Sequence, residues 1–542
     1  MRMNLKTLGT LALAAGACLL SASGAWAQDD GSGEACADVV EMSPTRTLRQ
    51  LSLDLWGRVP TAEEYAAVVD ADFDDEALDA LVGEMLDAPE FENFVNRYHL
   101  DLLWPNIQGL ELVNGGIAYL LPASFYEGGI SGDYTTERMF SLLTGLYARG
   151  GLVPCADEPA EFDENGAPVM EPWPDGTMRE GYVWVEPYWA PGTEVKVCAL
   201  EAREAAVGNN GLACNTLNGL GSGGCGCGPQ LQHCMSIDAA NMIQPSIRGQ
   251  MMAMVQEIIQ SDRPYTDVLT DKVEMINGPL VHYYRYLAQM AVDPFIQSPQ
   301  VLMEDLPELE FNDTEWQAVD RPEPHAGVLT SMAFLLRFQT NRARANRFYT
   351  AFLCEPFQAP PDGLPSPNDE CSQEPDLRKR CGCNYCHSAL EPAAGYWGQF
   401  AEAGTYLMTR DEFPIYSARC AACAETGQCD FICERFYVTE AGHPDEEPFL
   451  GVLKSYQWRG ETEASYVEQG PSGLVQRALD NGQLARCAVD NLFNRLYRRP
   501  MTDAERRERL PELAQAFIDS DYSFKALVRS LVTDAAYGRM AR

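Results

Sequence analysis

The sequence predicts a mainly α-helical protein of several domains, with an irregular, disulfide-rich insert that contains some β-hairpin. Three observations support this fold class. Apolar residues recur at helical spacing over most of the chain. Between residues 110 and 235 that spacing fades, and Gly, Pro and aromatic residues become frequent. The chain also has 18 cysteines in 542 residues, which is far above ordinary usage.

Composition and charge exclude several classes of protein. With 46% hydrophobic and 22% charged residues, the chain is neither a coiled coil, nor collagen-like, nor wholly disordered. Its 79 acidic residues against 40 basic ones give a net charge of -39. Because such a surface repels phosphate backbones, we expect no nucleic-acid partner.

The N-terminus has the pattern of a signal peptide, which we place at residues 1–27. A basic start with Arg2 and Lys6 precedes an apolar run, and Ala25-Trp26-Ala27 gives an A-x-A cleavage site. A retained membrane anchor is the alternative. Because no other stretch reaches about 18 uninterrupted apolar residues, we expect no transmembrane segment in the mature chain. These features predict a periplasmic, extracellular or cell-surface protein whose cysteines meet an oxidising compartment.

A flexible, acidic lead-in at 28–42 precedes an expected N-terminal helical domain at 43–109. Its first helix places three leucines on one face, and capping-box residues open its second helix. The residues concerned are Leu48, Leu51, Leu55, Thr61 and Glu64.

The insert at 110–235 has one clear β signal. Residues 182–185 and 194–197 alternate on either side of Pro191-Gly192, which predicts a hairpin. A group of possible metal ligands occupies its second half, but disulfides are the expectation in an exported protein. This group contains Cys214, Cys225, Cys227, His233 and Cys234.

Helical spacing returns in a domain at 236–354, where it is expected to extend through Val273. The methionines of this domain, such as Met251 and Met252, sit at core spacing and are interpreted as packing residues. Residues 355–376 are rich in Pro, Asp and Ser and are expected to form a linker. A C-terminal helical domain is expected at 471–542.

One motif indicates chemistry, and it lies in an expected haem c and Cys-rich region at 377–470. Cys383-Asn384-Tyr385-Cys386-His387 has the form C-x-x-C-H, the attachment signature of c-type haem. Two thiols at this spacing bond the two vinyl groups of the porphyrin, and the next residue offers an imidazole as proximal iron ligand. The motif therefore predicts one covalent haem c, as in cytochrome c. A C-x-x-C disulfide or dithiol that happens to precede a histidine is the alternative.

The motif leaves two questions open. Cys381 creates a second, longer C-x4-C-H pairing, but we expect Cys381 to form a disulfide. Attachment through Cys383 and Cys386 then leaves an odd number among the other mature cysteines. The distal iron ligand is undecided between Met408, His443 and an empty position.

Four further cysteines fall within fourteen residues: Cys420, Cys423, Cys429 and Cys433. Four thiolates suit zinc or an iron–sulfur cluster. In an exported protein two disulfides are the expected outcome. No nucleophile elbow, zinc-protease or phosphate-loop motif occurs, and no catalytic residue set stands out.

Four stretches of the chain carry a family resemblance, in the family's order. They are residues 49–61, which read R-Q-L-S-L-D-L-W-G-R-V-P-T, then 254–283, 327–354 and 498–537. The chain resembles the exported proteins of unknown function that accompany Planctomycete-type cytochrome c domains. Two positions depart from the family pattern: Glu391 replaces Asp after the haem motif, with one extra residue, and His325 replaces Arg. The resemblance implies haem binding and export, but no settled enzymatic activity.

The leading hypothesis is an exported, c-type cytochrome-like protein that transfers electrons to an exported redox partner protein. A disulfide-stapled surface or scaffold protein without haem is one alternative, and a haem-assisted enzyme on an exported substrate is another. The basic triplet Arg378-Lys379-Arg380 precedes the haem motif. It is expected either to pair with nearby acids such as Asp376 or to orient an acidic partner.

Overall fold

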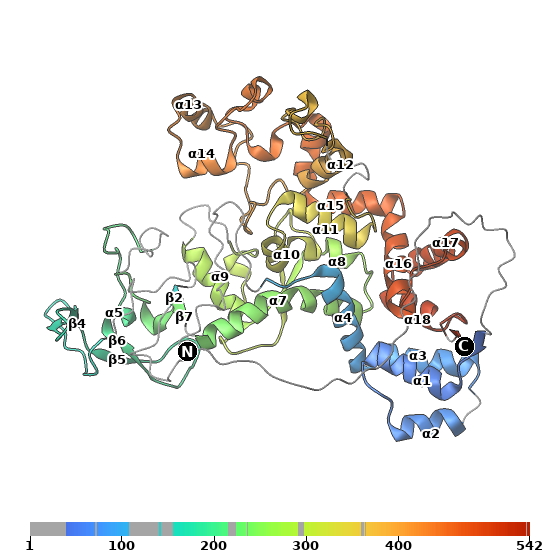
Figure 1. Ribbon diagram of the computed structural model, residues 1–542. Coiled ribbons are helices and arrows are strands. Elements are labelled where there is room, and N and C mark those ends of the chain that lie inside the picture. The colour runs from blue at the N-terminus through green and yellow to red at the C-terminus, as the bar shows by residue number, and fades with distance from the viewer. Residues whose placement is uncertain are drawn as a thin grey trace, which may run out of the picture.

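The computed structural model describes residues 39–70, 73–107, 140–141, 155–214, 224–235, 237–290, 298–358, 363, 365–537 and 539–541. The expected signal peptide, most of the lead-in and the first part of the insert lie outside these residues. The described chain is mainly α-helical, with short antiparallel strand pairs and a disulfide-rich irregular insert (Figure 1). This confirms the predicted fold class. Within the described residues, no helix is long and apolar enough to cross a membrane.

The N-terminal region is a group of packed helices. It consists of β1 (Val39–Glu41), α1 (Pro44–Leu51), η1 (Ser52–Trp56), α2 (Ala62–Asp70), α3 (Asp75–Asp87), η2 (Pro89–Phe91) and α4 (Glu92–Leu103). Leu48, Leu51 and Leu55 are buried, as their helical spacing predicts. The predicted capping box is also present, because the Glu64 N–H donates to Thr61 Oγ1 at 3.2 Å and the Thr61 N–H donates to Glu64 Oε2 at 2.7 Å.

The insert contains the predicted hairpin. Its elements are β2 (Phe140–Ser141), β3 (Glu171–Pro172), β4 (Met178–Arg179), β5 (Tyr182–Val185), β6 (Val195–Cys198), α5 (Ala199–Ala202), η5 (Pro229–Leu231) and β7 (Cys234–Met235). Strands β5 and β6 pair antiparallel, with Tyr182 opposite Cys198 and Val185 opposite Val195. The disulfides Cys155–Cys198 and Cys214–Cys225 fix this region where regular structure is sparse.

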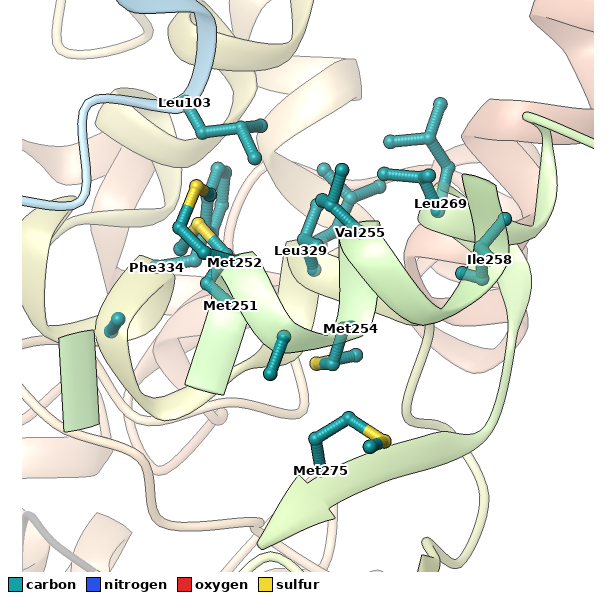
Figure 2. Packing of buried hydrophobic residues seen from close by; sticks show 14 of the residues in the cluster. Leu103, Met251, Met252, Met254, Val255, Ile258, Leu269, Met275, Leu329 and Phe334 are labelled. Carbon is teal, nitrogen blue, oxygen red and sulfur yellow. The ribbon is translucent and has the colours of Figure 1, made fainter. Parts of the chain in front are cut away.

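The central region is built on one long helix. Its elements are α7 (Ile237–Gln260), α8 (Asp267–Thr270), β8 (Val273–Ile276), α9 (Gly278–Met290), η6 (Met303–Asp305), β9 (Gln317–Asp320), η7 (Gly327–Thr330), α10 (Met332–Arg337) and α11 (Asn341–Phe352). Figure 2 shows Met251 and Met252 of α7 beside Phe334 of α10, and Met254 facing Met275 of β8. These methionines are buried, which confirms that they serve packing.

The expectation of helix through Val273 is wrong. Residues 273–276 form β8, which pairs antiparallel with β9 so that Val273 lies opposite Asp320. The partner strand lies more than forty residues later in the chain, so local periodicity gives no sign of it.

The region around the C-x-x-C-H motif contains η8 (Glu370–Ser372), α12 (Asn384–Gly395), α13 (Ala418–Thr426), α14 (Phe431–Phe436), η9 (Pro444–Phe449) and η10 (Lys454–Tyr456). In Figure 1, α12 lies above α11 and α15, while α13 and α14 project away from the helical body. A small core that includes Met408, Phe413 and Phe436 packs around Cys420 and Cys433.

A fully buried arginine fixes the loop that follows α12. Arg344 of α11 donates to the carbonyls of Leu335, Phe338, Ala401 and Gly404 at 2.9 to 3.2 Å. Burial lowers the pKa of this guanidinium to about 10, which leaves it charged at neutral pH. This one cation bonds carbonyls of residues 335–338 and of residues 401–404. It therefore holds the loop at 400–404 against α10 and α11.

The C-terminal region comprises α15 (Glu461–Asp480), α16 (Gln483–Tyr497), α17 (Asp503–Asp519), α18 (Phe524–Val532) and β10 (Arg539–Ala541). Helix α15 kinks where Gly470, with φ 65°, precedes Pro471. The kink follows because Pro cannot donate to the helical ladder and Gly tolerates a positive φ.

The two ends of the described chain meet. Strand β1 pairs antiparallel with β10, and Arg529 of α18 forms an ion pair with Asp79 of α3. The ring of Phe524 packs on Tyr98 of α4 at a centroid distance of 5.8 Å. The first and last helices accordingly lie side by side at one end of the molecule (Figure 1).

Candidate functional site

The C-x-x-C-H residues occupy the start of α12. Cys383 is the N-cap residue, and Cys386 and His387 follow in the first turn, where the His387 N–H donates to the Cys383 carbonyl at 2.9 Å. The chain enters this helix through Gly382, with φ 76°. Directly before it, a disulfide joins Cys381 to Cys371, as predicted for Cys381. The entry into the motif is therefore fixed covalently, while the motif itself begins on a partly exposed helical turn.

Cys383 and Cys386 are the two free cysteines among the described residues. Six disulfides join other described cysteines, and Cys227 is disulfide-bonded as well. This disulfide content is typical of a protein that folds in an oxidising compartment. Both free thiols are partly exposed, and the Cys386 thiol donates to the Gln358 carbonyl at 3.2 Å. The other described cysteines therefore form disulfides, and two free thiols remain at the spacing of the motif.

The imidazole of His387 is oriented by a carboxylate. Its Nδ1 lies 2.6 Å from Oε1 of Glu391, one helical turn later on the same face of α12. When Nδ1 carries the proton and donates to Glu391, Nε2 keeps its lone pair and can bind a metal. Carboxylates that accept from a ligand histidine fix the tautomer and strengthen the imidazole as a donor.

Glu391 is held in turn by Arg342 of α11. The Arg342 guanidinium donates from Nε at 2.6 Å and from Nη2 at 3.2 Å. Burial acts to raise the pKa of the Glu391 carboxyl, but the bonds and charge of Arg342, together with the bond to His387, hold that pKa below its ordinary value. Glu391 is therefore ionised at neutral pH. Arg342, Glu391 and His387 form a chain of charge-assisted hydrogen bonds across α11 and α12.

A cleft adjoins this chain of bonds. It has a volume of about 790 Å³ and is bounded by the start of α11, residues 375–380, α12, α14 and residues 453–459. Helix α12 contributes Glu391 and Ala394, which continue the helix face that carries His387. His387, Cys383 and Cys386 are not among the residues that line the cleft.

The two candidate distal ligands lie in different surroundings. Met408 is 5% exposed and lines the cleft that Glu391 also lines. His443 is the N-cap residue of η9, where its Nδ1 accepts from the Asp445 N–H at 3.2 Å, and it does not line the cleft. The structure thus brings Met408, and not His443, to the surface that Glu391 contributes.

The other cysteine clusters form disulfides, as expected. Cys420 pairs with Cys433, and Cys423 pairs with Cys429. In the insert, Cys225 pairs with Cys214, and the ring of His233 approaches Gln232 at 3.3 Å. One described group, Cys155, Glu180 and Cys198, has metal-like spacing, but its two sulfurs are bonded to each other.

The three residues of the basic triplet differ in their contacts and exposure. Arg378 donates to the buried carboxylate of Asp376 at 3.0 and 2.9 Å, so it forms the structural pair that was one of the two expectations. Arg380 donates to the Glu374 carbonyl, and the Lys379 side chain is 69% exposed. Lys379 is therefore the member of the triplet with the greatest access to a partner.

The donor set fits the haem that the motif implies. Covalent attachment requires two free thiols at this spacing, and both are present in the first turn of α12. Iron ligation requires a neutral imidazole with an available nitrogen, and the bond from His387 to Glu391 leaves Nε2 for that purpose.

Sequence analysis missed two residues of this site. Glu391 appeared only as a departure from a family pattern, although its i+4 spacing from His387 on a helix was available as a signal. Arg342 lies far earlier in the chain, and no local pattern relates it to the motif.

The chain matches no family model, no curated protein and no solved structure in the comparisons with known proteins.

Proposed function

We propose that the protein is an exported c-type cytochrome that carries one covalent haem and transfers electrons. Cys383 and Cys386 form the thioether bonds, and His387 Nε2 ligates the iron. The resemblance to exported proteins with Planctomycete-type cytochrome c domains supports the same proposal.

One observation supports the proposed haem attachment most directly. The two described cysteines that escape disulfide formation are the two that the attachment motif requires. In an oxidising compartment, adjacent thiols at C-x-x-C spacing are expected to form a disulfide unless another bond claims them. Haem attachment provides that other bond.

The haem supplies one-electron chemistry, and the chain's residues set its environment. Glu391 and Arg342 hold the imidazole of His387 in one tautomer and orientation. Met408 is the favoured distal candidate because it lines the cleft that Glu391 also lines, whereas His443 does not line this cleft. We therefore expect Met408→Ala to change the ferric spectrum and the reduction potential, and His443→Ala to leave both unchanged.

The attachment is tested by export of the full chain from cells that contain c-type haem maturation machinery. The wild type is expected to retain one haem per chain after acid–organic extraction, and Cys383→Ser/Cys386→Ser is expected to retain none. Cys423→Ser/Cys429→Ser is the matched control, because it also removes two nearby cysteines but should keep the haem. A wild type without covalent haem would contradict the proposal.

The redox partner is proposed to be a second exported protein, in the periplasm or at the cell surface. Lys379 is the exposed cation of the triplet, with its Nζ 4.0 Å from Asp376, whereas Arg378 donates to Asp376 at 2.9 Å. Lys379→Gln is therefore expected to slow electron exchange with an acidic carrier at low salt more than Arg378→Gln does. Stopped-flow reduction over an ionic-strength series measures this difference, and equal rates for Lys379→Gln and wild type would exclude steering by Lys379.

A further inference from the structure

The cleft beside α12 has an unusual charge balance for this chain. Six cationic side chains line it: Arg342, Arg378, Arg380, Arg435, Lys454 and Arg459. Five acidic residues line it as well, whereas the whole chain has 79 acidic residues against 40 basic ones. A protein with this overall charge has ample carboxylates to neutralise its cations, so a local excess of cations requires an explanation.

Four of these cations form no ion pair within 4.0 Å among the described residues. Arg342 and Arg378 are neutralised by Glu391 and Asp376. In contrast, the hydrogen bonds of the other four go to backbone carbonyls. Lys454 Nζ donates to the carbonyls of Glu434 and Arg435 at 2.7 and 3.0 Å. Arg459 donates to the carbonyls of Ser455 and Glu391 at 2.6 and 2.8 Å. Arg380 donates to the Glu374 carbonyl, and Arg435 donates to the Glu402 carbonyl.

Two acidic residues of the cleft accept hydrogen bonds from backbone N–H groups. Glu402 accepts from the Asn341 N–H at 2.9 Å, and Glu446 accepts from the backbone N–H groups of Gly442 and His443 at 2.7 and 3.1 Å. Burial lowers the pKa of the guanidinium groups of Arg435 and Arg459, although the charge of Glu402 near Arg435 and that of Glu391 near Arg459 act in the opposite direction.

Two buried polar atoms in the cleft lining also lack a hydrogen-bond partner. They are Nε of Arg435 and Oγ of Ser455. Buried donors without partners are rare in native proteins and often mark the place of a ligand. Apolar walls complete the cleft, since Phe400, Phe436 and Trp458 also line it.

We propose that this cleft binds the oxyanion groups, carboxylate or phosphate, of a small molecule. Arg435, Lys454 and Arg459 supply the positive charge, and the aromatic side chains form the walls beside the bound group. Two sources have this chemistry: a free organic acid, or the propionate carboxylates of a haem attached at Cys383 and Cys386. The second source rests on the proposed function, whereas the anion site itself does not.

The anion site is tested first on the haem-free full chain, Cys383→Ser/Cys386→Ser. Citrate is titrated by calorimetry in a low-chloride buffer, because chloride competes and salt screens the attraction. One site is expected. Arg435→Gln and Lys454→Gln, each in this background, should weaken binding about tenfold or more, since each removes a charged donor. Arg435→Lys should restore part of the affinity.

The control is Arg419→Gln in the same background. Arg419 of α13 is a cation of the same region, but it forms an ion pair with Asp430 and does not line the cleft. It should leave citrate binding unchanged. Thermal unfolding of each variant separates loss of the site from loss of the fold. Absence of citrate binding, or equal binding by the folded Arg435→Gln and Lys454→Gln variants, would overturn the inference.

The haem-loaded wild type then identifies the source. Citrate binding that persists in this form assigns the cleft to a free acid. Citrate binding that is lost when haem is attached assigns it to the propionates. If the wild type acquires no haem, the proposed function fails, but the titration of the haem-free chain still decides whether the anion site exists.

Discussion

In the proposed haem-loaded protein, Glu391→Gln is expected to raise the reduction potential of the haem. In the structure, His387 Nδ1 lies 2.6 Å from a carboxylate that Arg342 and burial hold in place. Glutamine keeps the length and the hydrogen-bond acceptor of this side chain but removes its charge. The imidazole then becomes a weaker donor to the iron, and the ferric state, which needs the stronger donor, loses more stability than the ferrous state.

The magnitude follows from the kind of bond that changes. A hydrogen bond to a charged group contributes about 1.5 to 3 kcal/mol, and a neutral one contributes about 0.5 to 1.5 kcal/mol. A difference of about 1 to 1.5 kcal/mol between the two oxidation states corresponds to roughly 45 to 65 mV, because 59 mV is a tenfold change for a one-electron couple. We therefore expect the potential of Glu391→Gln to lie about 50 mV above that of the wild type.

The assay is a potentiometric titration of the haem-loaded full chain, followed by its visible spectrum. Glu402→Gln is the matched control, because Glu402 lines the same cleft and loses the same charge but has no hydrogen bond to His387. The reduction potential of the Glu402→Gln variant should shift much less than that of Glu391→Gln. An equal shift in both variants would show that a general charge effect acts instead of the hydrogen bond. No shift in Glu391→Gln would refute the role of this carboxylate.

Three further predictions concern stability. Burial lowers the pKa of His99 to about 4, so between about pH 6.5 and 4 the unfolded chain binds a proton that the folded chain does not. The free energy of unfolding should therefore fall by up to about 3 kcal/mol as the pH falls through this window. Urea unfolding of His99→Gln should show a shallower dependence of this free energy on pH. Removal of the disulfide Cys354–Cys487, which closes a loop of 133 residues, should lower the free energy of unfolding by up to about 5 kcal/mol. Removal of Cys423–Cys429, which closes a loop of 6 residues, should lower it by about 2 kcal/mol. Equal losses of stability in calorimetry would contradict the loop-entropy explanation. Arg344→Met should lower the free energy of unfolding by at least about 3 kcal/mol, because it leaves several buried carbonyls without a donor; a loss below 1 kcal/mol in urea would show that these carbonyls find other partners.

The elements that the sequence predicts correctly depend on local signals. The leucines at 48, 51 and 55, the capping box of Thr61 and Glu64, and the hairpin around Pro191-Gly192 each depend on residues that are close in the sequence. Their physical basis, which is side-chain periodicity and backbone capping, needs no knowledge of the rest of the fold. C-x-x-C-H is also a local signal, and the haem attachment that it indicates stays a prediction.

The features that the sequence does not reveal depend on long-range contacts. The pairing of β1 with β10 joins the two ends of the described chain, and the pairing of β8 with β9 overrides a local helical pattern. The cleft cations come from four separate segments of the chain, so nothing in the sequence shows that Lys454 and Arg380 share a site. Disulfide formation was predictable from export and cysteine number, but the partners were not, because many pairings satisfy the same count.

Mass mapping of the attachment peptide tests the central claim most directly. The full chain, exported from cells with c-type haem maturation machinery, is digested without reduction, and the peptide that contains Cys383 and Cys386 is isolated. We predict that this peptide is heavier by one haem and absorbs in the visible region, while Cys381 is recovered in a disulfide with Cys371. A peptide of unmodified mass, or one in which Cys383 and Cys386 are bonded to each other, would contradict the account.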